Sequence, residues 1–232
     1  MIIGSVLSGE EFKRLNKGKK FYKLTTFDEL HNGFQFRDNL NVDIVEFNPL
    51  GECKGGGMYF ADFENIFDWI TYGSKQMYWI REVRILNDSK VYIESGKFKT
   101  DKFALLKRKS IYDNEEYCKI IVKKNGWALE YVKNQTDEIC KLAVQKYGLA
   151  LSFVKKQTPE ICKLAVQKTY TALAFVEHQT DEICKLALEQ TPYALYWIKN
   201  QTDEICKIAV EKDETILRYI KRNDSDTQNQ NI

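Results

Sequence analysis

Cysteine is the residue type whose spacing first suggests chemistry in this chain. Five of the six cysteines recur every 22 residues, at Cys118, Cys140, Cys162, Cys184 and Cys206. Equivalent positions on stacked helices lie roughly 8–10 Å apart, whereas a disulfide needs Cα atoms within about 7 Å of each other. The sequence has no Cys-x-x-Cys pair, and only His31 and His178 could complete a zinc site. The spacing therefore predicts buried, unreactive thiols rather than disulfides or a metal centre.

The second candidate for chemistry is a run of three glycines at 55–57, which precedes Tyr59. A glycine run lets the backbone approach a ligand closely or turn sharply. It lacks the Gly-Lys-Ser/Thr ending of a phosphate-binding P-loop, so it does not indicate binding of a nucleoside triphosphate. The sequence leaves two roles open for the run: a ligand-binding loop, or a turn before a buried strand.

The cysteines belong to a region of internal repeats. Residues 114–223 consist of five consecutive 22-residue units with no insertion or deletion, called the first to fifth repeats below. From the second repeat on, each opens at a threonine that is a good helix N-cap: Thr136, Thr158, Thr180 or Thr202. Asp or Pro and then Glu follow, as suits the first helical turn. A second helix is predicted through Ala150 to Val154 and the equivalent segments, and stacking of these hairpins predicts an α-solenoid.

Two recurring columns of the array have a structural interpretation. A lysine column, Lys119, Lys141, Lys163, Lys185 and Lys207, has a glutamate three residues before each member, within reach on the same helix. It is therefore predicted to be a solvated face neutralised by its own glutamates. An aromatic column could stack nucleic-acid bases, but its alternation with Leu, Val and Ile predicts core packing; it contains Tyr131, Phe153, Phe175, Trp197 and Tyr219. In the fifth repeat, Arg218, Lys221 and Arg222 predict a polar terminal cap.

Function is predicted at positions that differ between repeats whose frame is otherwise constant. Large aromatic residues at such positions suit a protein-binding hot spot. The candidate partner-binding residues are Trp127, Leu149, Tyr170, Tyr193 and Tyr196. Tolerated surface variation would give the same pattern, and the sequence leaves both explanations open.

The repeats resemble a known group of proteins through the recurring core LALxxVKNQTxEICxLAV, which covers nearly all of residues 114–223. This core is similar to the short helical repeats of uncharacterised giant-virus proteins of the mimivirus group. The resemblance implies a helical-hairpin fold and no particular activity.

The first half of the chain predicts an α+β domain. Ser8 with Glu11 predicts a capping box that opens a short helix. Alternating apolar residues predict strands at 20–24, 58–60, 78–86 and 90–94, with Arg81, Glu82 and Arg84 on a solvated strand face. Helical segments are predicted at 27–32 and 63–72, and Trp69 and Trp79 are predicted to be core residues.

Residues 20–95 weakly resemble the ADP-ribosyltransferase core through the segments KFYKLTT, ELHNGF, GGGMYFADFENIFDWITYG and WIREVRI. The resemblance implies NAD as cofactor, with Tyr59 matching a tyrosine that stacks on nicotinamide and Thr25 near a Ser/Thr position. Lys23 stands where that family has its NAD-binding histidine, and Glu94 is the nearest counterpart of the catalytic glutamate. The candidate ligand-binding residues are Tyr22, Thr25, His31, Gly56, Gly57 and Tyr59.

Bulk composition excludes some classes of partner. The net charge is +2, from 35 basic and 33 acidic residues, which is too balanced to indicate a nucleic acid or an anionic membrane. A lysine cluster near the start still leaves a nucleic-acid scaffold open. No apolar run approaches the roughly 18–20 residues that span a bilayer, and the first residues lack the features of a secretion signal. The expected location is therefore intracellular, and the resemblance to giant-virus proteins implies the cytoplasm of a virus-infected host cell.

Together these patterns predict three segments: an α+β domain at 1–108, an all-α helical-hairpin repeat array (an α-solenoid) at 109–223, and a disordered tail at 224–232. The predicted function is a protein-interaction scaffold or adaptor with an unidentified protein partner and no cofactor. The alternative is an ADP-ribosyltransferase-like enzyme, or an inactive relative that binds a nucleotide or peptide, with the repeats used for targeting. NAD is expected only under that alternative, and the sequence predicts no oligomeric state.

Overall fold

The structure is a computed structural model that describes residues 2–50, 56–72 and 75–221. The chain divides into two compact units, Met1–Tyr117 and Cys118–Ile232. We call them the sheet domain and the repeat array. Cys53, Gly55, Arg222 and the predicted tail at 224–232 lie outside the described residues.

The sheet domain is built on an antiparallel sheet with the strand order β1-β10-β11-β6-β2-β9-β12-β5, and β13 also pairs with β9. The hairpins β3–β4 and β7–β8 stand apart from it. The strands are β1 (Val6–Ser8), β2 (Phe21–Thr25), β3 (Leu30–His31), β4 (Phe34–Gln35), β5 (Asn39–Val42), β6 (Met58–Asp62), β7 (Thr71–Tyr72), β8 (Lys75–Gln76), β9 (Trp79–Arg84), β10 (Lys90–Ile93), β11 (Phe98–Thr100), β12 (Lys102–Leu105) and β13 (Lys109–Ser110). The helices are short: α1 (Gly9–Leu15), α2 (Phe63–Ile66) and the 3₁₀ helices η1 (Phe67–Trp69) and η2 (Ile111–Asp113).

Several predicted elements of this domain are confirmed. Ser8 caps α1 by accepting a hydrogen bond from the Glu11 N–H at 3.2 Å, and strands β2, β6, β9 and β10 lie within one or two residues of their predicted positions. The helical turn predicted at 27–32 is wrong. Asn32 and Gly33 have φ of 50° and 81°, and two consecutive residues with positive φ form the tight turn of a hairpin, here β3–β4. The helix predicted at 63–72 ends at Trp69 and gives way to strand β7.

Phe12 of α1 lies at the centre of the sheet domain's core and is fully buried. Its ring centroid lies 5.0 Å from that of Phe21 on β2, 5.9 Å from Phe60 on β6 and 5.1 Å from Phe98 on β11. Each aromatic pair at such a distance adds about 0.5–1.5 kcal/mol beyond the burial of apolar area. These contacts fix a helix of seven residues that could not persist alone.

A buried ion pair also stabilises this domain. Arg81 on β9 is fully buried and donates from Nη1 to both carboxylate oxygens of Glu29, at 2.8 and 3.1 Å. Arg81 Nε donates to the Leu106 carbonyl at 3.0 Å, and Asp38 makes a further ion pair with the guanidinium group. The prediction that Arg81 lies on a solvated face is therefore wrong. The alternation of apolar and polar residues shows which face of a strand is exposed only when one face is solvated, so it does not identify a strand that is covered on both faces.

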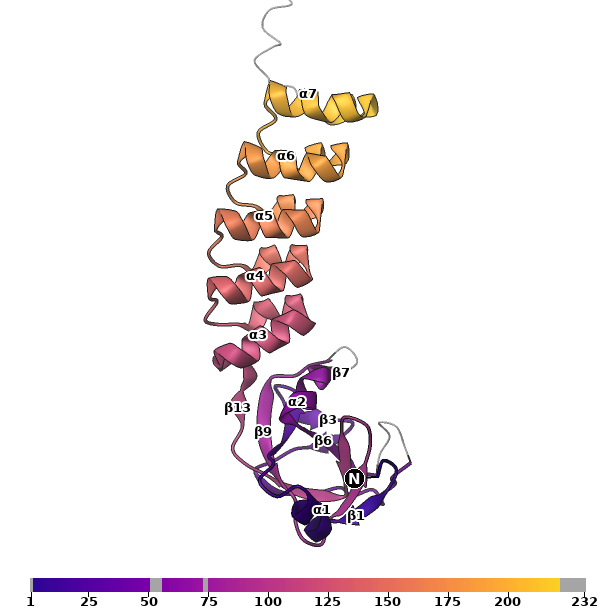
Figure 1. Cartoon of the computed structure of the whole chain (residues 1–232). Helices are drawn as coiled ribbons and strands as arrows, with labels where there is room; N and C mark the ends of the chain where they lie inside the picture. The colour runs from indigo at the N-terminus through magenta and orange to yellow at the C-terminus, as the bar shows by residue number, and fades with distance from the viewer. Residues whose placement is uncertain (1, 51–55, 73–74, 222–232) are drawn as a thin grey trace, which may run out of the picture. The chain divides into compact units, whose positions relative to one another are not determined.

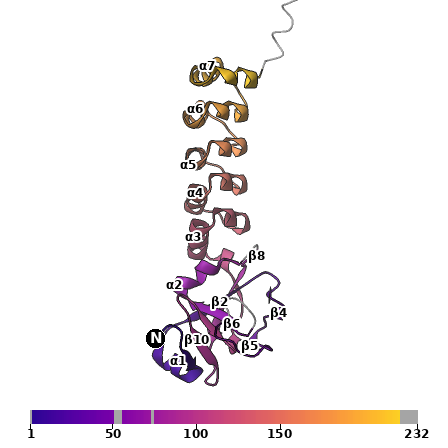
Figure 2. The same ribbon diagram turned by 90° about the vertical axis from the view of Figure 1, so that its right-hand side faces the viewer.

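The repeat array alternates α-helices with 3₁₀ helices. The α-helices are α3 (Glu115–Lys124), α4 (Asp137–Lys146), α5 (Pro159–Lys168), α6 (Asp181–Gln190) and α7 (Asp203–Lys212). The 3₁₀ helices are η3 (Gly126–Tyr131), η4 (Gly148–Phe153), η5 (Tyr170–Phe175), η6 (Pro192–Trp197) and η7 (Glu214–Tyr219). Within the array the α-helices follow one another in a row (Figure 1), and the 3₁₀ helices form a second row beside it (Figure 2).

The predicted helix starts are confirmed. The hydroxyls of Thr136, Thr158, Thr180 and Thr202 each accept a hydrogen bond from the backbone N–H three residues later, at 3.3–3.4 Å. The second segment of each repeat is helical as predicted, but it is a 3₁₀ helix. Extended residues on both sides, such as Tyr147 and Val154, leave it only six residues. Because a 3₁₀ helix rises about 2.0 Å per residue, six residues extend about 12 Å, close to the length of the ten-residue α-helix beside them.

The core of the array is a set of columns of small and branched side chains. In the second repeat these are Ile139, Ala143, Ala150 and Leu151, all fully buried. Each α-helix from α4 on contacts the next α-helix, and each 3₁₀ helix contacts the next 3₁₀ helix. Burial therefore depends on the neighbouring repeats.

A glutamine at the end of a repeat joins it to the following one. Gln179 Nε2 donates to the carbonyls of Leu173 at 2.9 Å and of Trp197 at 3.0 Å, and its Oε1 accepts the Lys199 N–H at 2.8 Å. Gln135 and Gln201 make the same three bonds. These side chains satisfy backbone groups that helix or sheet pairing would otherwise have to satisfy. Sequence reasoning missed this role.

The lysine column is paired differently from the prediction. Lys119, Lys141, Lys163 and Lys185 form ion pairs at 2.6–2.8 Å with Glu138, Glu160, Glu182 and Glu204, each in the next repeat. Pairing between repeats arises because stacking places the N-terminus of the next α-helix, which carries the glutamate, beside the lysine. Each exposed pair contributes only about 0.2–1 kcal/mol, but together they favour one stacking register.

Candidate functional site

The aromatic column lies on the surface of the array, not in its core. Tyr131, Phe175 and Trp197 are exposed, and Phe153 and Tyr219 are half-buried, so the prediction of core packing is wrong. The fully buried residues on the same 3₁₀ helices are the alanine and leucine, for example Ala194 and Leu195. A 3₁₀ turn has three residues, which directs the aromatic ring away from the side that packs on the α-helix.

The predicted partner-binding residues fall into separate places on this surface. Trp127 is 41% exposed, and its ring lies 5.7 Å from Phe153 and 6.3 Å from Tyr147; we call these three residues the first aromatic patch. Leu149 and Tyr170 are half-buried and belong to no ring cluster among the described residues.

Tyr193 and Tyr196 belong to a larger group that spans the fourth and fifth repeats. Tyr193 is 42% exposed and Tyr196 is 57% exposed. Their rings lie 6.3 and 6.0 Å from Tyr219, and Tyr196 lies 4.9 Å from Trp197. We call these four residues the second aromatic patch. The Arg218 guanidinium lies 5.0 Å from the centroid of the Tyr219 ring, at its border.

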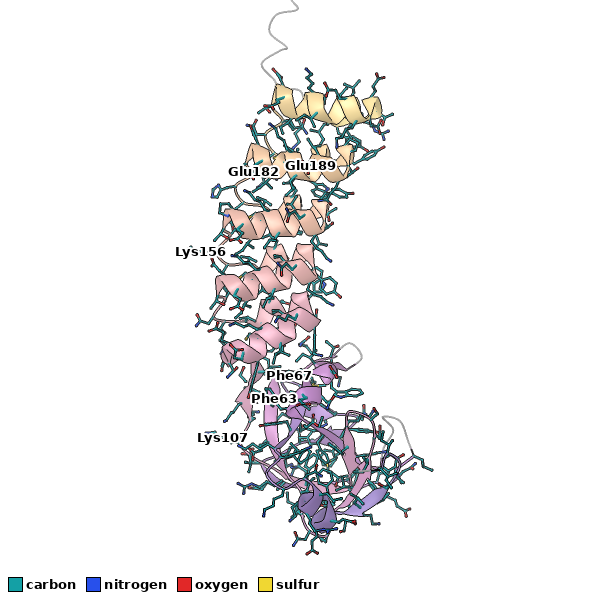
Figure 3. The ribbon with its side chains drawn as sticks, viewed as in Figure 1. Phe63, Phe67, Lys107, Lys156, Glu182 and Glu189 are labelled. Atoms are coloured by element: carbon teal, nitrogen blue, oxygen red, sulfur yellow. The ribbon has the colours of Figure 1, made fainter. Side chains whose placement is uncertain are left out.

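Charged side chains surround the array elsewhere. Lys156, Glu182 and Glu189 are exposed and extend outward from it (Figure 3). Both signs of charge occur on the described surface of the array.

The cysteines are buried as predicted in four of the five repeats. Cys118, Cys140, Cys162 and Cys184 are buried, and Cys206 is half-buried. Burial raises the pKa of the Cys140 and Cys184 thiols to about 11, with a smaller contribution from Asp137 and Asp181 respectively. Such thiols remain protonated at neutral pH and are poor nucleophiles.

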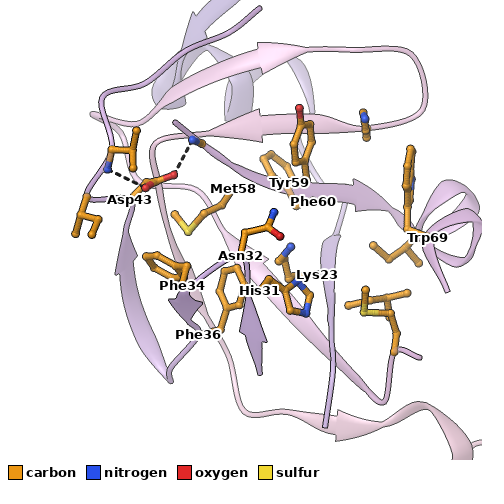
Figure 4. A pocket seen from close by; sticks show the side chains of 18 residues that line it. Lys23, His31, Asn32, Phe34, Phe36, Asp43, Met58, Tyr59, Phe60 and Trp69 are labelled. Carbon is orange, nitrogen blue, oxygen red and sulfur yellow. Dashed lines mark hydrogen bonds between the residues drawn. The ribbon is translucent and has the colours of Figure 1, made fainter. Parts of the chain in front are cut away.

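The sheet domain contains a pocket of about 240 Å³ among its described residues. Strands β2 and β6, the β3–β4 hairpin, the segment after β5 and helices α2 and η1 contribute side chains to it. Figure 4 shows Phe34 and Phe36 at one side of the pocket and Trp69 at the other, with Lys23, His31 and Asn32 between them.

Three of the six predicted ligand-binding residues line this pocket: His31, Gly57 and Tyr59. Gly57 has a φ of 141°, and a Cβ there would lie 2.7 Å from Lys99 Cε, so glycine is required for this close approach. Its N–H donates to the Asp43 carboxylate at 2.6 Å.

The other three predicted ligand-binding residues do not line the pocket. Thr25 is fully buried and donates to Glu29 at 3.1 Å, within the ion-pair network. Tyr22 points to the other side of β2, where its ring lies 5.8 Å from Phe63. Gly56 is buried beside the Glu46 carbonyl and accepts a hydrogen bond from the Asn48 N–H at 2.8 Å. Thr25 and Gly56 therefore have structural roles here.

The pocket also contains two lysines that were not among the candidate ligand-binding residues. Lys97 Nζ lies 4.4 Å from the ring centroids of both Tyr59 and Trp69 and forms an ion pair with Glu94 at 3.2 Å. Lys23 Nζ lies 4.7 Å above the Phe36 ring. Only the fold brings Lys97 beside Tyr59 and Trp69, so no local sequence signal could have identified Lys97 as a pocket residue.

Trp69 and Trp79 are half-buried, so the prediction that they are core residues is not met.

His31 is neutral in this environment. Its Nε2 accepts a hydrogen bond from the Thr26 N–H at 3.1 Å. Burial lowers the pKa of His31 to about 3, and the charges of Lys23 and Lys75 add to the effect. The ring proton therefore sits on Nδ1, whose N–H has no hydrogen-bond partner among the described residues.

The described residues contain no group of three or more His, Cys, Asp or Glu that could hold a metal ion. None of the described helices is long and apolar enough to cross a membrane.

Comparison with known proteins gives a family match in the repeats and relatives in a mimivirus. A family model described as a domain of unknown function (DUF4116) matches residues 114–158, the first two repeats. A "Putative ankyrin repeat protein" of Acanthamoeba polyphaga mimivirus is 31% identical over 85 residues, which is 36% of this chain and 40% of that protein. An uncharacterized protein of the same virus is 37% identical over 57 residues, 24% of this chain and 41% of that protein.

A second mimivirus protein with the same ankyrin repeat description is 38% identical over 53 residues, 22% of this chain and 16% of that protein. The chain therefore matches less than half the length of each of these relatives. No solved structure matches the chain. None of these matches supports the resemblance to ADP-ribosyltransferases.

Proposed function

We propose that this chain is a protein-binding scaffold in which the repeats form an α-solenoid that presents aromatic side chains to a protein partner. The observation that carries the proposal is the second aromatic patch. Four rings from two adjacent repeats meet there, and Tyr193, Tyr196 and Trp197 are all exposed. Tyrosine and tryptophan are the residues most enriched at binding hot spots.

The contrast between frame and surface supports the same proposal. The frame positions, for example Ala194 and Leu195, are fully buried. The position of Tyr196 is Glu130, Ser152, Ala174 or Arg218 in the other repeats. Burial explains why the same residue types recur at the frame positions. The exposed aromatic side chains of the fourth repeat are not needed for that burial. Exposed clustered rings of this kind are typical of an interaction site.

The relatives are consistent with a scaffold. Two of them are described as ankyrin repeat proteins, and ankyrin repeats form stacked arrays with extended binding surfaces. Because the matching relatives are mimivirus proteins, we propose that the partner is met inside an infected host cell.

The experiment compares the full chain with a Tyr193→Ala/Tyr196→Ala variant as bait in lysate from infected host cells. A partner retained by the unaltered chain should be lost by the variant, while the thermal midpoint of unfolding changes little because both side chains are exposed. Ser152→Ala, at the repeat position of Tyr196, is the matched control. If the Tyr193→Ala/Tyr196→Ala variant captured every partner as well as the Ser152→Ala control did, the second aromatic patch would not be the binding surface.

The ADP-ribosyltransferase alternative rests on the pocket position of Tyr59. Its candidate catalytic glutamate, Glu94, forms an ion pair with Lys97 at 3.2 Å and does not line the pocket. Incubation with labelled NAD tests this alternative directly. Neither transfer of label nor a thermal shift with NAD is expected if the chain is only a scaffold.

A further inference from the structure

The pocket in the sheet domain is a cavity that the scaffold function leaves unexplained. Its volume of about 240 Å³ exceeds the roughly 150 Å³ of an apolar protein cavity that takes up benzene, so two fused rings would fit in it. Most of its lining is apolar or aromatic, and its aromatic side chains are Phe34, Phe36, Tyr59, Phe60 and Trp69. A cavity lined in this way, with a few polar groups, is typical of a small-molecule site.

The aromatic rings of the lining are placed to receive a flat ligand. Phe34 and Phe36 lie at one side of the pocket, with ring centroids 4.9 Å apart, and Trp69 lies at the other (Figure 4). Aromatic rings attract one another in offset-stacked and edge-to-face arrangements with centroids about 4.5–7 Å apart. A flat ring system between the two sides would therefore contact rings on both.

The charged side chains of the described lining are already engaged. The Asp43 carboxylate accepts hydrogen bonds from two backbone N–H groups, at 2.6 and 2.9 Å. Lys97 forms an ion pair with Glu94 at 3.2 Å. Lys23 is engaged as well, and its Nζ lies 4.7 Å from the centroid of the Phe36 ring. A charged ligand would lose its hydration here and would have to displace one of these partners, which costs free energy. The lining therefore favours an uncharged ligand.

One hydrogen-bond donor of the lining is available to a ligand. His31 is neutral and its Nε2 accepts the Thr26 N–H, so its proton is on Nδ1. This Nδ1–H has no partner among the described residues. No fully buried side-chain nitrogen or oxygen in the described part of the chain lacks a hydrogen-bond partner, so Nδ1 is accessible from the pocket that His31 lines. An acceptor atom on the ligand would complete this hydrogen bond.

We propose that this pocket binds an uncharged bicyclic aromatic molecule that carries one hydrogen-bond acceptor. The ring system lies between Phe36 and Trp69, and the acceptor atom takes the Nδ1–H of His31. The site does not involve the aromatic patches of the repeat array, so it does not depend on the scaffold function.

The test measures binding of four probes of similar shape to the unaltered full chain by isothermal titration calorimetry at neutral pH. Quinoline is uncharged and has one ring acceptor, and naphthalene has the same ring system without the acceptor. The other two probes carry a charge: 2-naphthoate is an anion and 1-methylquinolinium is a cation. We expect quinoline to bind about two- to tenfold more tightly than naphthalene, as one net hydrogen bond implies. It should bind at least about tenfold more tightly than either charged probe.

Three results would overturn the proposal. They are equal affinities of quinoline and naphthalene, tighter binding of either charged probe than of quinoline, and no binding of quinoline at millimolar concentration.

A nuclear magnetic resonance measurement on the same unaltered chain tests the hydrogen bond directly. The chain has two histidines, His31 and His178, and His178 is exposed and outside the pocket. In protein with nitrogen-labelled histidine, quinoline should shift the Nδ1 signal of His31 and leave that of His178 in place. An unchanged His31 signal in the presence of bound quinoline would contradict the assignment.

Variants then locate the bound probe. Trp69→Leu should weaken binding of quinoline and of naphthalene about tenfold or more, with the preference for quinoline retained. Trp127→Leu changes an exposed tryptophan outside the pocket and should leave both affinities unchanged. His31→Phe should abolish the preference for quinoline over naphthalene. If Trp69→Leu fails to fold, Phe34→Leu gives the same measurement. Full affinity in the ring variant that folds would place the probe elsewhere and refute the proposal.

Discussion

The glutamine clamp between repeats gives a prediction whose magnitude follows from the structure. Gln179→Ala removes three hydrogen bonds at once, to the Leu173 and Trp197 carbonyls and from the Lys199 N–H. A hydrogen bond of this type contributes about 0.5–1.5 kcal/mol net, so the free energy of unfolding should fall by about 2–4 kcal/mol. Part of the loss acts on the interface between the third and fourth repeats, because two of the bonds cross it.

The assay is urea unfolding of the full chain, followed by helical circular dichroism and by tryptophan fluorescence. Repeats that are coupled through their interfaces unfold together, and weakening one interface separates the transition into parts. In Gln179→Ala we therefore expect a broader transition, in which the change of tryptophan fluorescence and the loss of helix no longer coincide. Gln167→Ala is the matched control, because Gln167 is exposed and lies on α5 away from the clamp.

The control should change the free energy of unfolding by no more than about 0.5 kcal/mol. The reasoning is refuted if Gln179→Ala loses no more stability than Gln167→Ala, or if it loses stability with an unchanged single transition. The first result would mean that water replaces the clamp at no cost, and the second that the interface does not depend on it.

Three further predictions concern burial. Leu151→Ala should lower the free energy of unfolding by about 2–5 kcal/mol. Leu217→Ala, at the same repeat position but 57% exposed, should lower it by less than about 1 kcal/mol. Similar losses for the two variants in urea unfolding would contradict the observed burial. Iodoacetamide at pH 8 should label Cys140 at least about tenfold more slowly than Cys206, because burial raises the pKa of Cys140 to about 11. Peptide mass spectrometry measures both labelling rates. The folded-state pKa of His31, about 3, lies below its usual 6.5, so the unfolded state binds this proton more readily and stability falls as pH drops from 6.5 toward 3. His31→Gln should reduce that slope in urea unfolding at pH 7, 5.5 and 4.5, and an unchanged slope would show that His31 does not contribute.

The exposed Leu217 lies beside the described part of the predicted terminal cap. Its counterparts Leu129, Leu151, Leu173 and Leu195 are fully buried by the following repeat. Arg218 and Lys221 are polar as predicted, but they do not cover this leucine. The sequence pattern showed which residues are polar and could not show which of them cover the end of the stack.

The candidate site was predictable only in part. Gly57 was found because a glycine run is a local signal, and His31 and Tyr59 were found through the resemblance to ADP-ribosyltransferases. Lys97 was missed because its partner rings, Tyr59 and Trp69, are contributed by distant segments. Thr25 was assigned to a ligand through a resemblance, yet it is held by Glu29 in the core.

What the sequence determined by itself is the periodic part of this protein: the 22-residue unit, the threonine caps, and the buried thiols and apolar columns. These follow from spacing and from contacts within a few residues, which are visible in any single repeat. Only the tertiary structure decided that four of the five lysines pair with the next repeat, that the aromatic column lies at the surface, and that residues from β2, β3, β6 and position 97 line one pocket. The physical reason is that these features depend on distances between segments far apart along the chain, which packing sets and local propensity does not.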